Sequence, residues 1–218
     1  MGALTDAIQK GDAARVSELI EANPALLQAH DGPATPLLTA IYHGKNDIAR
    51  LLVERGAPVS FPEACALGDL AQVERQLTAD PDLLHVLSSD GYPPLGLAIF
   101  FHHPDVARLL IERGANVNTP AANAQRVAPV HAAAAASDHA TMRLLLQGGA
   151  DPNAQQQMDY TPMHGAASRG DVEMAKLLLE HGAERHPKAS DGQTPADVAR
   201  SHGHPEFAEW IGSASVAR

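Results

Sequence analysis

The sequence predicts an all-α solenoid, in which short helix pairs stack along one axis instead of enclosing one common core. Four prolines recur at spacings of 35, 33 and 33 residues: Pro94, Pro129, Pro162 and Pro195. Three glycine-alanine pairs recur at spacings of 35 and 33, beginning at Gly114, Gly149 and Gly182. Hydrophobic residues make up 44% of the chain but aromatic residues only 4%, which suits a core of thin, closely stacked helices.

The clearest copy of the repeated unit spans residues 160–183, YTPMHGAASRGDVEMAKLLLEHGA. Pro162 is suited to the first turn of a helix, because its φ is fixed and it has no N–H to leave unpaired. Gly170 ends this helix, and Asp171 can cap a second helix whose apolar residues follow at helical spacing. Gly182 ends the second helix at a position that favours a left-handed residue. The unit is therefore predicted to be a helix-turn-helix.

These TPLH-like and LLLxxGA-like strings, repeated at a period near 33, closely resemble the ankyrin repeat. The resemblance covers nearly the whole chain. It implies an ankyrin-repeat solenoid with short β-turn fingers between the repeats from the third to the seventh. The length of 218 residues corresponds to about 6.6 such units, so we expect about seven helix pairs.

We interpret residues 1–218 as a single ankyrin repeat domain. The first unit lacks the Thr-Pro start and the last lacks a final Gly-Ala turn, as expected of terminal units that face water on one side. Bulky Trp210 is predicted to cover the last face. The predicted units are an N-terminal cap at 1–30, repeats at 31–58, 59–88, 89–118, 119–153 and 154–186, and a C-terminal cap at 187–218.

The first half of the chain looks like a duplicated pair of repeats. Gly11-Asp12 and Pro24 recur 57 residues later as Gly68-Asp69 and Pro81. The fourth unit mirrors the second at a spacing of 58. We therefore expect the third unit to resemble the N-terminal cap more than it resembles its neighbours.

Charge and composition indicate which partners to expect. The net charge of -10 opposes binding to nucleic acid, since phosphate contacts need clustered Lys and Arg. The chain has no stretch of eighteen apolar residues and no basic start followed by an apolar run, so we expect no membrane partner and a cytoplasmic location. The single cysteine, Cys65, is predicted to be a small core residue. We expect a monomer.

The twelve histidines are the abundant residues with catalytic potential. His131 and His164 occupy the histidine of the TPLH motif, where the resemblance implies hydrogen bonds within and between repeat turns. The other notable histidines are His102-His103, at the interhelical turn, and the His202-x-His204 pair. Zinc needs three or four ligands, and no third ligand lies at motif spacing, so we predict no metal and no cofactor.

No string resembles a nucleophile elbow, a phosphate-binding glycine loop or an HExxH helix, so the sequence predicts a noncatalytic protein. The functional alternative is a histidine-dependent metal hydrolase on the same scaffold. Elemental analysis would separate the two hypotheses.

The resemblance implies that a concave face, formed by the last residues of each first helix and by the finger tips, binds another protein. The selected partner-binding residues are Tyr42, His43, Leu67, Phe100, Phe101, Ser168 and Arg169. Equivalent positions elsewhere hold Ala66, Ala135, Ala136, Ser201 and His202. Weaker candidates in the fingers are Tyr92, Met158 and Tyr160. Exposed aromatic residues are enriched at protein interfaces, and three of the chain's seven phenylalanines and tyrosines fall in this helix set.

Two alternatives to this site remain open at this point. Phe100 and Phe101 could simply repack a junction in which His102 replaces the usual glycine. The acidic surface could instead recruit a cationic partner by long-range attraction. We predict that alanine at Tyr42, Phe100 and Phe101 abolishes partner binding and leaves the melting temperature nearly unchanged.

Overall fold

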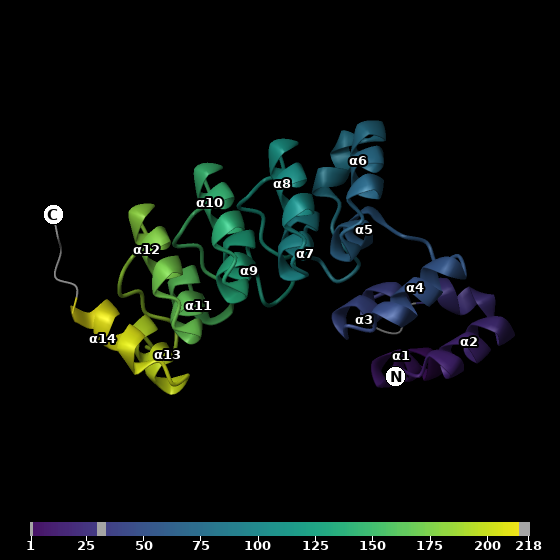
Figure 1. Cartoon of the computed structure of the whole chain (residues 1–218), viewed down its shortest axis with the longest axis horizontal. Coiled ribbons are helices and arrows are strands. Elements are labelled where there is room, and N and C mark those ends of the chain that lie inside the picture. Colours follow the sequence, from purple (N-terminus) through teal and green to yellow (C-terminus); the bar gives the residue numbers. More distant parts are fainter. Residues whose placement is uncertain (1, 30–33, 214–218) are drawn as a thin grey trace.

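The computed structural model describes residues 2–29 and 34–213, in which α-helices and short 3₁₀ helices are joined by turns without any β-strand. The helices form consecutive antiparallel pairs that stack along one long axis, with α1 and α14 at opposite ends (Figure 1). The first helices of the pairs are α1 (Ala3–Lys10), α3 (Pro36–Tyr42), α5 (Phe61–Leu67), α7 (Pro94–Phe100), α9 (Pro129–Ala136), α11 (Pro162–Arg169) and α13 (Pro195–Ser201). The second helices are α2 (Ala13–Ala22), α4 (Asn46–Glu54), α6 (Leu70–Ala79), α8 (Pro104–Glu112), α10 (His139–Gln147), α12 (Val172–Glu180) and α14 (Pro205–Ser213). The predicted all-α solenoid is confirmed.

The predicted boundary between the first two units, at residues 30 and 31, lies outside the described residues. The predicted ends at residue 1 and at 214–218 also lie outside them. Within the described last pair, Phe207 and Ile211 are buried in the core, and Trp210 is half-buried with the guanidinium of Arg185 5.5 Å from its ring centroid. A cation over the indole face stabilises this end by roughly 0.5–1 kcal/mol.

Aspartate caps organise the outer row of helices. The side chains of Asp12, Asp69, Asp138 and Asp171 each accept a hydrogen bond from the backbone amide three residues further on. Such a cap satisfies one of the amides that a helix start leaves unpaired, and it contributes about 1 kcal/mol.

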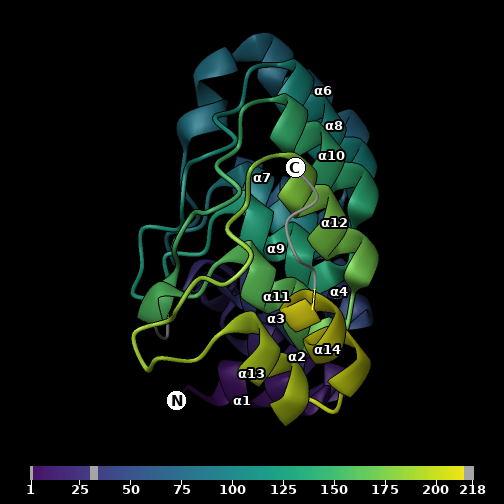
Figure 2. The same cartoon turned by 90° about the vertical axis from the view of Figure 1, so that its left-hand side faces the viewer.

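Fingers project between the later pairs, as predicted. Each is a turn closed by a backbone hydrogen bond, from Ser88 N to Tyr92 O, from Gln156 N to Tyr160 O and from Ala189 N to Gln193 O. Backbone bonds such as Ala122 N to Gly91 O, at 2.7 Å, join one finger to the next. Figure 2 shows these turns as a layer beside the helices.

A left-handed residue separates the two helices of every pair. Five pairs use glycine at this position: Gly11, Gly44, Gly68, Gly170 and Gly203. The fourth and fifth pairs use His102, with φ of 60°, and Ser137, with φ of 52°. Left-handed backbone costs a side-chain-bearing residue roughly 1–2 kcal/mol, so these two pairs accept a strain that the other five avoid.

The core is interrupted between the second and third pairs. Buried residues of the first two pairs form one cluster, which Ala66 of the third pair and Leu97 of the fourth also join, and the other buried residues from the third pair onward form a second cluster. The outer helices α6, α8, α10 and α12 pack side by side, but α4 and α6 stand apart (Figure 1). A groove of about 560 Å³ lies at this junction, between α4 and the carboxyl end of α5, and its lining includes the apolar side chains of Ile41, Val53, Leu67 and Phe101.

The duplication predicted from the sequence gives this interruption a cause. The chain after α2 forms a 3₁₀ helix at Pro24–Gln28, and the chain after α6 repeats it at Pro81–His85. Each cap-like pair also joins the next pair through an arginine, Arg55 in one case and Arg113 in the other. The third pair is therefore built like the first pair, and α3 meets α5 less closely than α5 meets α7.

Candidate functional site

A groove on the concave side joins the fourth, fifth and sixth pairs at the carboxyl ends of α7, α9 and α11. It has a volume of about 500 Å³. We call it the concave groove. Its lining residues are Phe100, His102, Ala132, Ala135, Ala136, Ser137 and Arg169.

The groove exists because α9 is built from small side chains. Ala132–Ala136 is an unbroken run of alanines in this helix. Counted back from the left-handed residue, Ala135 occupies the position of Phe100 in α7 and of Tyr42 in α3. A methyl group between larger neighbours leaves a hollow, with Phe100 at one end and Arg169 at the other.

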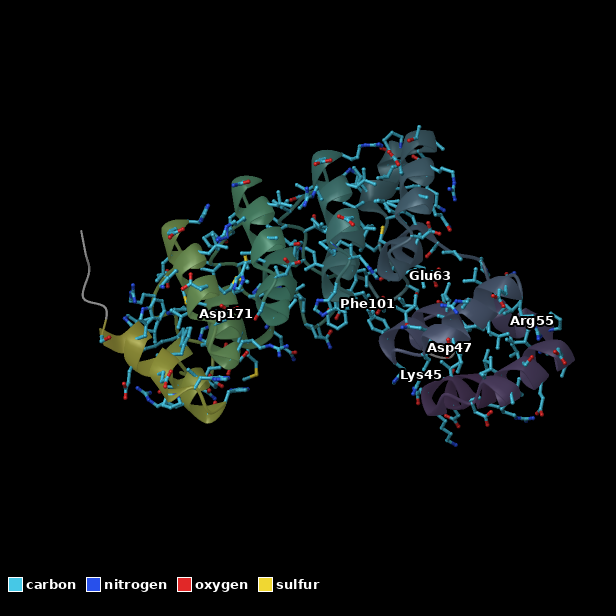
Figure 3. The ribbon with its side chains drawn as sticks, viewed as in Figure 1. Lys45, Asp47, Arg55, Glu63, Phe101 and Asp171 are labelled. Atoms are coloured by element: carbon cyan, nitrogen blue, oxygen red, sulfur yellow. The ribbon has the colours of Figure 1, made fainter. Side chains whose placement is uncertain are left out.

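The structure gives the two adjacent phenylalanines different surroundings. Phe100 is 54% exposed and lines the concave groove. Phe101 is half-buried and extends from the end of α7 toward α3 and the N-terminal core cluster (Figure 3). Their rings meet edge to face with centroids 5.0 Å apart. Phe101 thus has the packing role considered from the sequence, whereas Phe100 remains accessible.

Tyr42 is also a packing residue. Its ring centroid lies 5.4 Å from that of Phe101, and its hydroxyl donates a 2.6 Å hydrogen bond to Asp90 Oδ2 in the finger of the fourth pair. Burial, with the Asp90 hydrogen bond and charge, raises the pKa of this hydroxyl well above its usual range. Tyr42 therefore ties the second pair to the fourth across the weak junction, and its removal would disturb folding as well as any binding.

The remaining predicted site residues are spread along the same face. His43 is exposed, and Arg169 is exposed at the end of α11. The hydroxyl of Ser168 donates to the carbonyl of Gly165 at 2.9 Å. Leu67 is half-buried and lines the groove between α4 and the carboxyl end of α5, separate from the concave groove.

The finger candidates divide in the same way. Met158 is 51% exposed and has a left-handed backbone, with φ of 61°. Tyr160 packs against His164 with ring centroids 4.9 Å apart, and Tyr92 packs on the N-terminal core cluster. Only Met158 of the three presents a largely free side chain.

His131 and His164 link neighbouring repeats, as the resemblance implied. Nδ1 of each accepts a 3.1 Å hydrogen bond from the backbone amide three residues earlier. Nε2 then donates to carbonyls of the next finger, those of Ala154 and Tyr160 for His131 and that of Gln193 for His164. Burial lowers the pKa of both imidazoles, so they are neutral near pH 7.

The other histidines singled out in the sequence also have local contacts. His103 and His204 lie against the interhelical glycines of the preceding pairs, Gly68 and Gly170. Nδ1 of His202 lies 2.9 Å from the carbonyl oxygen of Val198. Within residues 2–29 and 34–213, no group of three or more His, Cys, Asp or Glu could hold a metal ion.

Cys65 is fully buried, as predicted, and burial raises the pKa of its thiol. A thiol that stays protonated is a poor nucleophile. Its role here is to fill space in the core of the third pair.

Sequence reasoning did not select His102 and Ser137 as site residues. Burial raises the pKa of the Asp171 carboxyl, but hydrogen bonds from the Met174 amide and from the His139 and Ser137 side chains outweigh it and hold the pKa low. Ser137 thus has an internal role. His102 is exposed, and its imidazole makes no hydrogen bond or ion pair within the described part of the chain, although its backbone is left-handed. In the sequence, both residues stand at the interhelical position that is glycine in the other five pairs, and this difference could have drawn attention to them.

Comparison with protein families agrees with this geometry. A model for three copies of the ankyrin repeat matches residues 61–156 and 130–216. A model for one ankyrin repeat matches residues 34–62. The chain belongs to the ankyrin repeat family. Ankyrin repeats are in general protein-interaction modules, and their partners differ from one protein to another.

Two curated relatives share part of the chain. A stretch of 108 residues is 35% identical to "Ankyrin repeat and SOCS box protein 16" of Homo sapiens, covering 46% of this chain and 23% of that protein. A stretch of 91 residues is 33% identical to "E3 ubiquitin-protein ligase KEG" of Arabidopsis thaliana, covering 42% of this chain and 6% of that protein. The chain therefore matches less than a quarter of the length of either relative.

The lengths of the ankyrin helices bear on membrane insertion. In the part of the chain that the structure describes, no helix is long and apolar enough to cross a bilayer.

Proposed function

We propose that this ankyrin chain is a noncatalytic, monomeric module of the cytoplasm that binds a partner protein through its concave groove. The observation that carries the proposal is the shared position of Phe100 and Arg169. They come from the fourth and sixth pairs, yet both line one hollow whose floor is alanine. An exposed aromatic residue beside an apolar hollow is typical of protein interfaces, where a few such residues supply most of the binding energy.

The repeat architecture supports a protein partner more than a small molecule. The groove is lined by residues of three consecutive pairs, and other predicted site residues, among them His43, Ser168 and the half-buried Tyr42, occupy corresponding positions at the ends of the first helices. A stacked solenoid holds such a face in place without help from the ligand, so little ordering free energy is lost when a partner binds.

Site-specific crosslinking tests this proposal. A photo-crosslinking amino acid in place of Ser168, which adjoins the groove through Arg169, should capture one partner protein in cells of the source organism. The same amino acid in place of Arg143, an exposed residue of the outer helix α10, is the matched control and should not capture it.

A second variant links capture to the groove. Phe100→Ala should remove the Ser168 crosslink and leave the helical circular dichroism signal unchanged. Equal capture from both positions, or capture that persists in Phe100→Ala, would show that the concave groove is not the binding surface.

A further inference from the structure

The concave groove has a charge opposite to that of the protein as a whole. The chain has a net charge of -10, but no carboxylate is among the groove's lining residues. Arg169 is the charged side chain of permanent sign that lines it. A partner that approaches this groove therefore meets a cation, even though most of the surface around the protein is acidic.

The guanidinium of Arg169 has no hydrogen bond or ion pair within residues 2–29 and 34–213. Some arginines elsewhere on the surface are paired, for example Arg55 with Glu21 at 3.0 Å and Arg200 with Asp197 at 3.0 Å, whereas Arg143 has no such partner in the described residues either. What sets Arg169 apart is its position in the lining of the concave groove. A guanidinium presents five donors in a planar fork that matches a carboxylate in a bidentate arrangement. An unpaired arginine at the edge of an apolar hollow is thus suited to an acidic ligand.

The opposite end of the groove is suited to an apolar group. Phe100 lines this end and is 54% exposed, and the groove is also lined by the small side chains of Ala132, Ala135 and Ala136. An aliphatic or aromatic side chain placed on this floor would remove both its own surface and part of that of Phe100 from water, which favours binding in proportion to the apolar area buried.

Building on the protein-binding role proposed above, we infer that the concave groove recognises a short segment of a partner protein in which an apolar side chain lies next to a carboxylate. The apolar side chain packs on Phe100 and the alanine floor. The carboxylate of an Asp or Glu, or of a chain end, accepts hydrogen bonds from Arg169.

His102 supports this assignment. It is exposed at the groove, its imidazole has no hydrogen-bond or ion-pair partner in the described residues, and it occupies a left-handed position that glycine fills in five other pairs. Backbone strain of this kind is concentrated at binding sites, where the side chain gained offsets the conformational cost. The imidazole adds a hydrogen-bond donor beside the hollow.

A random peptide library displayed on phage provides the probe. Selection on the immobilised full chain should enrich peptides that combine acidic and apolar residues. One enriched peptide is then synthesised, and its affinity is measured by fluorescence anisotropy. Arg169→Glu should weaken binding about tenfold or more, whereas the matched change Arg143→Glu on α10 should have an effect of less than about twofold.

A charge exchange makes the test specific to one contact. Replacing the peptide's acidic residue by lysine should abolish binding to the native chain and restore it, at least in part, to the Arg169→Glu variant. Phe100→Ala should weaken binding by about tenfold, and Leu70→Ala, at an exposed leucine of the outer helix α6, should not.

The outcomes separate this inference from the proposed function. Peptides that require Phe100 but are not acidic, or that ignore Arg169→Glu, would overturn the carboxylate inference and leave the groove as a protein-binding site. Basic peptides that ignore both variants would overturn the inference and the groove together, in favour of attraction by the acidic surface. Failure to enrich any peptide would also overturn it, because the inference requires a short linear segment.

Discussion

The ring of His103 lies directly against the backbone of Gly68, where it leaves no space for a side chain, and Nε2 of the same ring lies 2.9 Å from the carbonyl oxygen of Ala66. The same relationship is found between the sixth and seventh pairs. There His204 lies against Gly170, and its ring is 2.7 Å from the point at which a side chain at Gly170 would place its Cβ. Gly44 is different, because nothing lies within 4 Å of the corresponding point. The uncovered glycine belongs to the junction at which the stack is interrupted.

Two glycine substitutions should therefore differ in cost. Gly44→Ala and Gly68→Ala each place a methyl group on left-handed backbone, which costs roughly 1–2 kcal/mol. Gly68→Ala also displaces His103, and overpacking of this kind costs about 1–3 kcal/mol more. Urea unfolding followed by circular dichroism measures the difference. Equal losses in the two variants would contradict the close packing at Gly68 or the open junction at Gly44.

His102→Gly should be tolerated or stabilising. Relief of left-handed strain gains about 1–2 kcal/mol, partly offset by the freedom that glycine gains in the unfolded chain, so the net gain is expected to be about 0.5–1 kcal/mol. The reverse change, Gly203→His, is the matched control and should lower the free energy of unfolding. A peptide selected for the concave groove should bind His102→Gly more weakly. A variant that is less stable than the native chain would contradict the strain at His102.

Stability should fall as the pH drops below about 6.5. The pKa values of His131 and His164 are lowered in the folded state, so below the unfolded pKa the unfolded chain binds protons that the folded chain does not. Stability from these groups is therefore complete above the unfolded pKa and is lost as the pH falls towards the folded pKa, by up to about 1.4 kcal/mol per histidine and pH unit. Urea midpoints at pH 7.5, 6.5 and 5.5 would measure this.

Variants of these two histidines identify the source of the pH effect. His131→Asn and His164→Asn should lower the stability at pH 7.5 and flatten its dependence on pH. His43→Asn, at an exposed histidine, should change neither. Constant stability from pH 7.5 to pH 5.5 in the native chain would contradict the lowered pKa values.

Tyr42→Phe should destabilise the chain more than Phe100→Ala does. The first variant removes only the hydroxyl that donates to Asp90, and a hydrogen bond to a charged acceptor contributes about 1.5–3 kcal/mol. The second truncates a ring that is mostly in water, at a cost of about 1 kcal/mol or less. Thermal melts of both variants test the order. The reverse order would mean that Phe100, not Tyr42, holds the second pair to the fourth.

Hydrogen exchange should divide the chain at the interrupted junction. Stability in a solenoid is a sum of repeat and neighbour terms, and the neighbour term between the second and third pairs is weak. We expect the amides of α1 to α4 to exchange together, faster than those of α7 to α11, with mass spectrometry of peptic fragments as the measurement. Uniform protection across both groups would contradict this division.

The repeat framework was predictable because few residues determine it. The spacing of Pro94, Pro129, Pro162 and Pro195 gave the helix starts, and the Gly-Ala pairs gave the ends of the outer helices. Backbone constraints of this kind act locally, so they can be recognised without knowing what lies nearby in space. The fingers, the buried Cys65 and the contacts of His131 followed from the same register.

The concave groove could not be predicted in the same way. Its hollow depends on Ala135 being smaller than Phe100 and Ser168 on either side, which is a property of three stacked helices. The different surroundings of Phe100 and Phe101 depend on direction, since successive residues on a helix point about 100° apart. The alanine substitutions proposed from sequence treated both residues and Tyr42 as equivalent surface groups, and the Tyr42–Asp90 hydrogen bond shows that they are not.

The uncovered glycine at the second pair also has a mechanical meaning. Tension applied to the two ends of the solenoid would be carried in series by every junction, so the chain would extend first where α4 and α6 stand apart. The first two pairs would swing away on the remaining contacts of α3, among them the link from Thr35 Oγ1 to the buried carboxylate of Glu63. A partner protein bound to pairs on both sides of that junction would hold the two parts of the solenoid together. The solenoid would then resist bending as one rigid body.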